Sequence, residues 1–215
     1  LKSILSASQR YEVRKPTINA QFDIPDIDVE IYDSDLDKSY AFECKLAKNT
    51  SFQTANRRYP YPRCSIKVMR SRTLGEERAH QMAEIENIPV EMIKAHSDSY
   101  LSDHFEYVLT NLRNAFYRTS EDLFKYSPTP EELEFLGDFL GVRTAEEIDS
   151  ALKNTQYFID AKKLTPLHTG ISCTKRQCPN PDECEFIPNY PIFRLDDRCS
   201  WASIESLENE LNNLN

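Results

Sequence analysis

The sequence predicts an α/β protein in which a mixed sheet flanked by helices is followed by a helical region and a small cysteine-rich module. Three observations support this. Residues 26–31 alternate strictly between acidic and apolar side chains, as a strand with one apolar face does. Residues 98–126 repeat apolar side chains at helical spacing. Four cysteines gather among prolines near the end of the chain, where apolar periodicity almost disappears.

The composition is that of a folded protein, since 40% of the 215 residues are hydrophobic and 28% are charged. Only four glycines are present, which excludes the clustered glycines of phosphate-cradling loops. No apolar run approaches the roughly 18 residues of a membrane span. We therefore expect no membrane partner and an intracellular location, cytoplasmic or nuclear. The glycosylation sequon Asn49-Thr50-Ser51 is the one feature that favours secretion.

The α/β core is predicted over residues 1–96, with a basic insertion over 47–72. Pro16 ends the first helix, because proline cannot continue a helix. The polar turn at residues 33–37 joins two strands into a hairpin. The expected elements are a helix over 1–14, an extended segment over 17–24, strands over 26–31, 39–46 and 64–69, a helix over 74–86 and a strand over 88–95.

A helical region is predicted over residues 97–160, and the cysteine-rich module with a final helix over 165–215. The long helix over 98–126 ends before Pro128. Two shorter helices, over 131–140 and 144–154, are expected after it. The sequence Thr144-Ala145-Glu146-Glu147 has the form of a capping box, which would start the second of them.

The charges are segregated along the chain. The net charge is −9, yet residues 44–75 contain no acidic side chain and carry interleaved aromatic residues. Basic side chains among aromatic ones suit a phosphate backbone with stacking bases, so we expect a nucleic-acid partner. The alternative is a solvated basic loop. The candidate nucleic-acid contacts are Arg57, Arg58, Arg63, Lys67, Arg70 and Arg72.

The last four of the six cysteines have the spacing C-x4-C-x5-C-x14-C. A segment so poor in core-forming residues needs a covalent or metal staple. Four thiolates holding a structural Zn²⁺ are one solution; a disulfide pair, an iron–sulfur cluster and plain thiols are the others. His168 is a spare candidate ligand. The predicted zinc ligands are Cys173, Cys178, Cys184 and Cys199.

The two strands of the hairpin carry candidate catalytic chemistry. Asp26, Asp28 and Glu30 share one face of the first strand, and Glu43 and Lys45 share one face of the second. If the strands pair, these groups converge. Carboxylates beside a lysine suit a Mg²⁺ (or Mn²⁺) site for phosphodiester hydrolysis, because carboxylate oxygens hold hard cations and the cation activates water.

Pro25-Asp26-Ile27-Asp28 followed by Glu43-Cys44-Lys45 resembles the PD-(D/E)XK nuclease superfamily, which includes many restriction and defence endonucleases. The resemblance covers about residues 1–95 and implies a restriction-endonuclease-like core of helix, three strands, helix and strand. It implies a metal-dependent endonuclease, with DNA favoured over RNA. Asp28 and Glu43 would hold the metal, Asp26 competes with Asp28 for that role, and Lys45 would be the catalytic lysine. Glu12 and Gln53 match accessory residues of some members more loosely.

Two alternatives remain open at this stage. Acid-x-Lys triplets arise by chance, and a second one, Asp160-Ala161-Lys162, is present, where we expect a helix. The hairpin could therefore be a solvated one in which Lys45 pairs with Glu43. The protein would then be a non-catalytic helical interaction or scaffold protein with a metal-stabilised cysteine module. A homodimer or a larger complex is compatible with either function.

Overall fold

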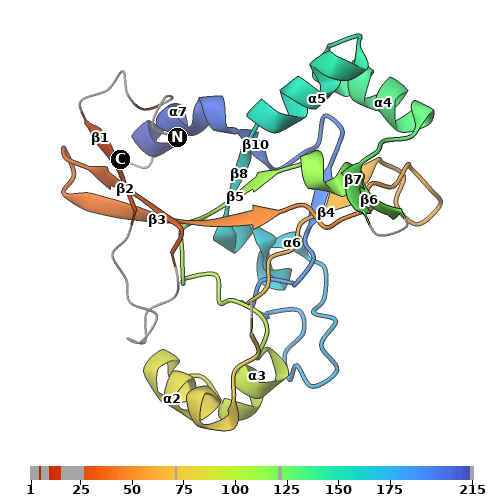
Figure 1. The fold of residues 1–215 in the computed structure, drawn as a ribbon. Coiled ribbons are helices and arrows are strands. Elements are labelled where there is room, and N and C mark those ends of the chain that lie inside the picture. The colour runs from red at the N-terminus through yellow and green to blue at the C-terminus, as the bar shows by residue number, and fades with distance from the viewer. Residues whose placement is uncertain (1–4, 6–9, 16–26, 71, 121–122, 214–215) are drawn as a thin grey trace.

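A computed structural model describes residues 5, 10–15, 27–70, 72–120 and 123–213 of the protein (Figure 1). The strands are β1 (Tyr11–Arg14), β2 (Val29–Asp33), β3 (Lys38–Leu46), β4 (Arg63–Ser65), β5 (Tyr107–Asn111), β6 (Tyr117–Ser120), β7 (Leu123–Tyr126), β8 (Tyr157–Asp160), β9 (Ile192–Arg194) and β10 (Ala202–Ser203). Within the described residues, six of them form a mixed sheet in the order β1-β2-β3-β5-β8-β10. The pairs β4 with β9 and β6 with β7 form two small sheets.

One half of the main sheet is an antiparallel meander. Val29 lies opposite Phe42 in the β2–β3 hairpin. The turn of this hairpin places Asp37 at a φ of 51°, a left-handed conformation that aspartate tolerates better than most residues. β3 then pairs in parallel with β5, with Phe42 opposite Tyr107. Parallel neighbours need a long crossover, and residues 47–106 provide it.

Helices and short turns make up the rest of the regular structure among the described residues. They are α2 (Glu76–Glu86), α3 (Val90–Ala95), α4 (Pro130–Leu140), α5 (Ala145–Asn154), α6 (Pro166–Thr169) and α7 (Leu207–Asn213), with short 3-10 turns η1 (Arg113–Phe116), η2 (Ala161–Leu164) and η3 (Ile204–Ser206). α7 covers one face of the sheet, where Leu207 and Leu211 pack in a buried cluster with Phe42, Leu109 and Phe158. Alternation along the strands explains this face, because successive side chains point to opposite sides.

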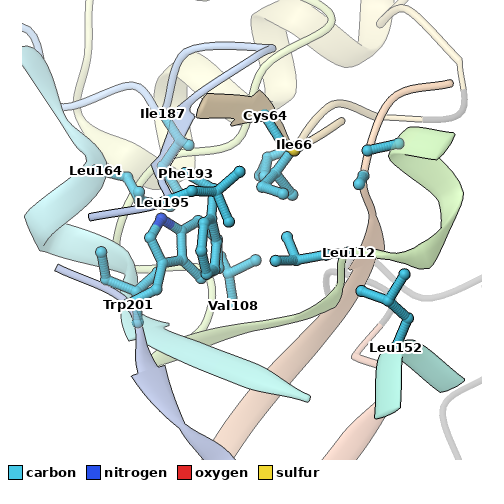
Figure 2. Packing of buried hydrophobic residues seen from close by; sticks show 14 of the residues in the cluster. Cys64, Ile66, Val108, Leu112, Leu152, Leu164, Ile187, Phe193, Leu195 and Trp201 are labelled. Atoms are coloured by element: carbon cyan, nitrogen blue, oxygen red, sulfur yellow. The ribbon is translucent and has the colours of Figure 1, made fainter. Parts of the chain in front are cut away.

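The opposite face of the sheet supports the largest buried cluster. Val108 contributes to it from β5, and Phe193 and Trp201 contribute from the C-terminal part of the chain (Figure 2). The rings of Phe193 and Trp201 lie 5.4 Å apart between centroids. Leu136 of α4 and Leu152 of α5 belong to the same cluster. Residues far apart in sequence therefore build one core.

α2 and α3 lie apart from the sheet, beside the loops that follow α6 (Figure 1). They have a buried cluster of their own, in which Ala79 and Ile93 meet Leu101, Cys184 and Phe186. This cluster joins the helices of the crossover to the cysteine-rich segment, and it positions the candidate metal-ligating group described below.

Two predicted elements of the first hundred residues are wrong. The end of the helix expected over 1–14 is strand β1, in which Tyr11-Glu12-Val13-Arg14 alternates and pairs with β2. The strand expected over 88–95 is helix α3, which begins after Pro89 and is rich in helix-forming Met, Glu, Lys and Ala. The extended segment expected over 17–24 lies outside the described residues.

The long helix expected over 98–126 is also wrong. Its centre is strand β5, which is buried on both faces. A strand buried on both faces is continuously apolar, so its pattern cannot be separated from that of a buried helix by periodicity alone. The aromatic and β-branched residues Tyr107, Val108 and Thr110 favour the strand. The hairpin and the helices over 74–86, 131–140, 144–154 and the C-terminal segment match observed elements, with small shifts of their ends.

The sequence predicts the C-terminal residues as a separate module. In the structure they pair with strands from other parts of the chain. β9 pairs with β4 from the basic insertion, and β10 pairs with β8 at the edge of the main sheet. In the part of the chain that the structure describes, no helix has the length and apolarity required to cross a membrane.

Candidate active site and metal centre

The β2–β3 hairpin brings together three of the predicted catalytic residues. Continuing its register beyond Val29 sets Asp28 opposite Glu43. The Asp28 carboxylate accepts a hydrogen bond of 2.8 Å from the backbone N–H of Cys44. Lys45 lies two residues beyond Glu43 on the same face of β3, and its Nζ is 2.5 Å from Glu43 Oε1. Asp26, the competing metal ligand, lies outside the described residues.

This pair is buried rather than solvated. Glu43 is 3% exposed, and the Lys45 side chain is 14% exposed. Tyr100 completes a triangle, because its hydroxyl donates to Glu43 Oε1 at 3.1 Å and accepts from Lys45 Nζ at 3.2 Å. The second carboxylate oxygen, Glu43 Oε2, is buried without a hydrogen-bond partner. A buried polar atom without a partner is costly, so this oxygen needs an explanation.

The electrostatics of the triangle favour an extra positive charge. Burial raises the pKa of the Glu43 carboxyl, and the neighbouring Asp28 charge adds to this, against the opposing effect of Lys45. Burial by itself lowers the pKa of the Lys45 ammonium, but the hydrogen bond and ion pair with Glu43, together with Tyr100, outweigh this and raise the pKa overall. Lys45 therefore stays protonated, and its charge compensates only in part for the burial of the Glu43 carboxylate.

The six predicted nucleic-acid contacts differ in their exposure to solvent. Arg57, Arg58, Lys67 and Arg72 are exposed. Arg63 is 8% exposed and stacks its guanidinium on the Tyr59 ring at 4.0 Å, so it is a structural residue rather than a surface contact.

Arg70 is half-buried and turned toward the triangle. Its guanidinium lies 4.8 Å from the centroid of the Tyr100 ring, and its Nε donates to the Ser99 carbonyl at 3.0 Å. It therefore reaches the site as a nearby cation. The accessory residues expected from the resemblance stay apart from the triangle: Glu12 forms an ion pair with Arg14 at 2.6 Å, and Gln53 accepts a hydrogen bond from Arg63.

A second group of chemistry-bearing side chains is built from the cysteine-rich segment. His96, Cys173, Cys178 and Cys184 place their ligand atoms within 4.8 Å of one another. His96 is the C-terminal cap of α3, and its ring stacks on Phe186 with centroids 4.2 Å apart. Three cysteines and one histidine are a common ligand set for structural zinc, so this group could hold a metal such as zinc.

The surroundings of His96 and the three cysteines determine their protonation states. His96 Nδ1 is 2.9 Å from the Met92 carbonyl oxygen, so it carries the proton, and Nε2 faces Cys173 Sγ at 3.3 Å. Burial lowers the pKa of His96 and keeps the ring neutral, which is the ligating form. Burial raises the pKa of the Cys184 thiol, and nearby Cys173 and Cys178 reinforce this. A bound cation would reverse that shift by favouring thiolates.

The structure places a different residue at the position of the fourth predicted zinc ligand. Cys199 lies outside this group and packs against the main buried cluster, while His96 occupies the fourth position. The spare candidate His168 is also elsewhere, with Nδ1 2.9 Å from Thr165 Oγ1. All six cysteines are free, so the structure has no disulfide staple. Cys199 was predicted because it is next along the chain, and linear order does not decide which side chains meet.

A third cluster consists of Glu86, Asp103 and His104. Both ring nitrogens of His104 already have protein partners: Nε2 lies 3.2 Å from Glu86 Oε1 and Nδ1 lies 3.2 Å from an Arg70 nitrogen. The Arg70 cation occupies the side that a metal would need. We therefore assign this cluster a structural role.

Sequence reasoning missed two residues of these sites, His96 and Tyr100. Neither belongs to a recognisable motif, and both reach their partners through contacts across more than 50 positions of sequence. No local signal identifies His96, because the four clustered cysteines already supply a complete ligand set in the sequence. Comparison of the chain with protein-family models, curated proteins and solved structures found no match.

Proposed function

We propose that the protein is a Mg²⁺-dependent endonuclease, of restriction or defence type, that hydrolyses phosphodiester bonds in nucleic acid, with DNA favoured. The observation that carries the proposal is the buried Glu43 carboxylate between Asp28 and Lys45, with Oε2 lacking a partner. A divalent cation held by Asp28 and Glu43 would complete the coordination of that oxygen and balance the raised pKa of Glu43.

The element order supports the same proposal. β2 and β3 are followed by β4, which lies outside the main sheet, then by helices α2 and α3 and by β5, parallel to β3. This is the strand–helix–strand part of the order that the resemblance to the PD-(D/E)XK superfamily implies, with β5 in place of the strand expected over 88–95. Glu43 and Lys45 lie near the end of β3, as the motif requires.

Each residue then has a role. Asp28 and Glu43 supply carboxylate oxygens to the metal, which when bound polarises the scissile phosphate and lowers the pKa of an attacking water. Lys45 remains protonated, so its ammonium group can donate hydrogen bonds to an anionic oxygen or orient the water. Tyr100 fixes Glu43 and Lys45 relative to each other. Exposed Arg57, Arg58, Lys67 and Arg72 would contact the phosphate backbone.

The test is a plasmid-cleavage assay with Mg²⁺ or Mn²⁺, repeated on RNA. We expect cleavage by the wild-type protein and a loss of at least about 100-fold in Glu43→Gln and Lys45→Ala. Glu30→Gln is a matched control, because Glu30 lies on β2 and bonds to Ser39 instead of the triangle. Thermal unfolding checks that the variants are folded.

Two outcomes would contradict the proposal. Cleavage that persists at the wild-type rate in Glu43→Gln would assign the activity to other residues or to a contaminant. Absence of cleavage of any DNA or RNA, with full biological activity in both variants, would favour a non-catalytic scaffold protein stabilised by its metal-ligating group.

A further inference from the structure

A cavity of about 570 Å³ lies between the basic insertion and the cysteine-rich segment. Its lining includes aromatic and cationic side chains that could recognise a ligand: Tyr59, Tyr61 and Tyr190, with Lys163, Lys175 and Arg194. Among the described residues that line it, none is acidic, although the chain as a whole carries a net charge of −9. Its volume is within the range of small-molecule sites and sufficient for one nucleotide.

Each of the three tyrosines has a cation on its ring. The Arg63 guanidinium lies 4.0 Å from the Tyr59 ring centroid, and the Arg194 guanidinium lies 3.8 Å from that of Tyr61. Lys48 Nζ lies 4.8 Å from the Tyr190 ring centroid. A cation on one face fixes a ring and makes it a more favourable partner for an electron-rich aromatic ligand.

The three cations of the wall differ in their acidic partners. Lys175 is paired with Asp98 and Arg194 with Asp196, each at 2.5 Å, but neither acid lines the cavity. Lys163 is exposed and has no acidic partner within ion-pair distance among the described residues. The wall therefore offers aromatic faces together with positive charge, the combination that binds a base and its phosphate.

We infer that this cavity binds one unpaired nucleotide of a single-stranded nucleic acid, with the base among Tyr59, Tyr61 and Tyr190 and the phosphate at Lys163 and Arg194. An unpaired nucleotide is required, because the faces of duplex bases are covered by their neighbours. The inference rests on the proposed function only for the identity of the ligand as nucleic acid, and it does not require cleavage.

The cavity adjoins the cluster of His96 and the cysteines, and the segment that lines it continues into the candidate active site. His96 of the metal-ligating group lines it, and so does Ser99, whose hydroxyl donates to Asn189 in the same wall. The next residue, Tyr100, contacts Glu43. A strand held in the cavity is thus bound beside the segment that carries Tyr100.

The experiment measures fluorescence anisotropy of labelled oligothymidylate and oligouridylate without added Mg²⁺ or Mn²⁺, so that binding is separated from cleavage. We expect Tyr61→Ala and Lys163→Glu to weaken binding of the single strand by about tenfold each. Tyr61→Phe keeps the ring and should bind as the wild type does. Lys162→Glu is the charge-matched control, because exposed Lys162 adjoins Lys163 but does not line the cavity.

The outcomes separate this inference from the proposed function. Unchanged binding in Tyr61→Ala and Lys163→Glu would overturn it, even if the wild type cleaves DNA. Equal competition by inorganic phosphate and thymidine monophosphate would also overturn it, because the cavity would then take anions without regard to the base. Loss of binding in both variants would support it, even if no cleavage is found. A preference between the two oligonucleotides would assign DNA or RNA as the source.

Discussion

The two oxygens of the Glu43 carboxylate have different surroundings. Oε1 bonds to Lys45 and Tyr100, while Oε2 is buried without a partner. A structural ion pair in a protein interior is usually satisfied at every polar atom, because burying an unpaired one is unfavourable. The asymmetry at Glu43 is therefore the residue-level feature on which the proposed metal site rests.

The hydroxyl of Tyr100 should contribute to stability through Glu43 and Lys45. Replacing Tyr100 with Phe removes both hydrogen bonds of the triangle, and we expect the free energy of unfolding in urea to fall by about 1–2 kcal/mol. Tyr40→Phe is the matched control. Tyr40 is equally buried, but its hydroxyl has no partner, so its removal should cost nothing. Equal losses in the two variants would contradict the role of the triangle.

The raised pKa of Glu43 predicts a pH dependence with a definite sign. Without a divalent cation, the folded state holds the Glu43 proton more tightly than the unfolded state, whose carboxyl titrates near the ordinary value of 4.5. The stability advantage of the wild type over Glu43→Gln should be complete below that value and shrink as pH rises through the folded-state pKa. Denaturation of both proteins across this window measures it. An advantage that grows with pH would contradict the burial effect.

The same denaturation measurements with added Mg²⁺ test whether the cation binds at Glu43. A cation on the Glu43 carboxylate favours its charged form, so it should stabilise the wild type most at neutral pH and have little effect on Glu43→Gln. A stabilisation that is equal in both proteins would assign the cation to another place. This measurement is independent of any nuclease activity.

At the level of elements, local patterns were predictable and long-range ones were not. The hairpin follows from strict alternation in Asp26-Ile27-Asp28-Val29-Glu30-Ile31 and a polar turn, both of which act over a few residues. The prediction of a helix at β5 was wrong, because burial on both faces of the strand removes the alternation of apolar and polar side chains. Its identity as a parallel strand depends on β3, which lies more than 60 positions earlier and is invisible to a local pattern.

The candidate sites divide in the same way. Asp28, Glu43 and Lys45 could be predicted, because strand geometry and one hairpin register bring them together. His96 could not be predicted, because its place beside the cysteines depends on how α3 packs against the segment after α6. Contacts of that kind are set by the burial of apolar side chains across the whole chain.

The capping box of α5 gives a prediction at the element level. Thr144 Oγ1 accepts from the Glu147 backbone N–H at 3.2 Å, and Glu147 Oε2 accepts from the Thr144 N–H at 2.9 Å. Thr144→Ala removes the first bond and should lower the free energy of unfolding by about 1 kcal/mol. Glu146→Gln, in the same exposed turn, should have almost no effect. If Thr144→Ala behaves like the control, the cap does not stabilise α5.

Segment 96–100 makes contacts with several distant parts of the molecule. His96 belongs to the metal-ligating group, Asp98 pairs with Lys175, and Tyr100 holds Glu43 and Lys45. The same segment lines the cavity through Ser99. A metal at the first of these residues would therefore anchor the cysteine-rich segment and the crossover helices next to the candidate active site.

This arrangement predicts that zinc is a stabilising element of the entire fold. We expect the purified protein to contain about one zinc per chain by elemental analysis, and its removal by a strong chelator to lower the free energy of unfolding by about 4 kcal/mol or more. Cys184→Ser and His96→Ala should lose the metal. Cys199→Ser should retain it, because Cys199 packs in the main cluster.

The Cys199 comparison decides between the spacing along the sequence and the contacts in the fold. Zinc that is lost in Cys199→Ser and kept in His96→Ala would restore the four-cysteine site and remove the link from the metal to segment 96–100. If zinc is instead lost in His96→Ala and kept in Cys199→Ser, chelation should also reduce binding of a single strand at the cavity. The reason is that His96 belongs to both the cavity wall and the ligand set. The stability of the fold and its capacity to bind nucleic acid would then depend on the same metal ion.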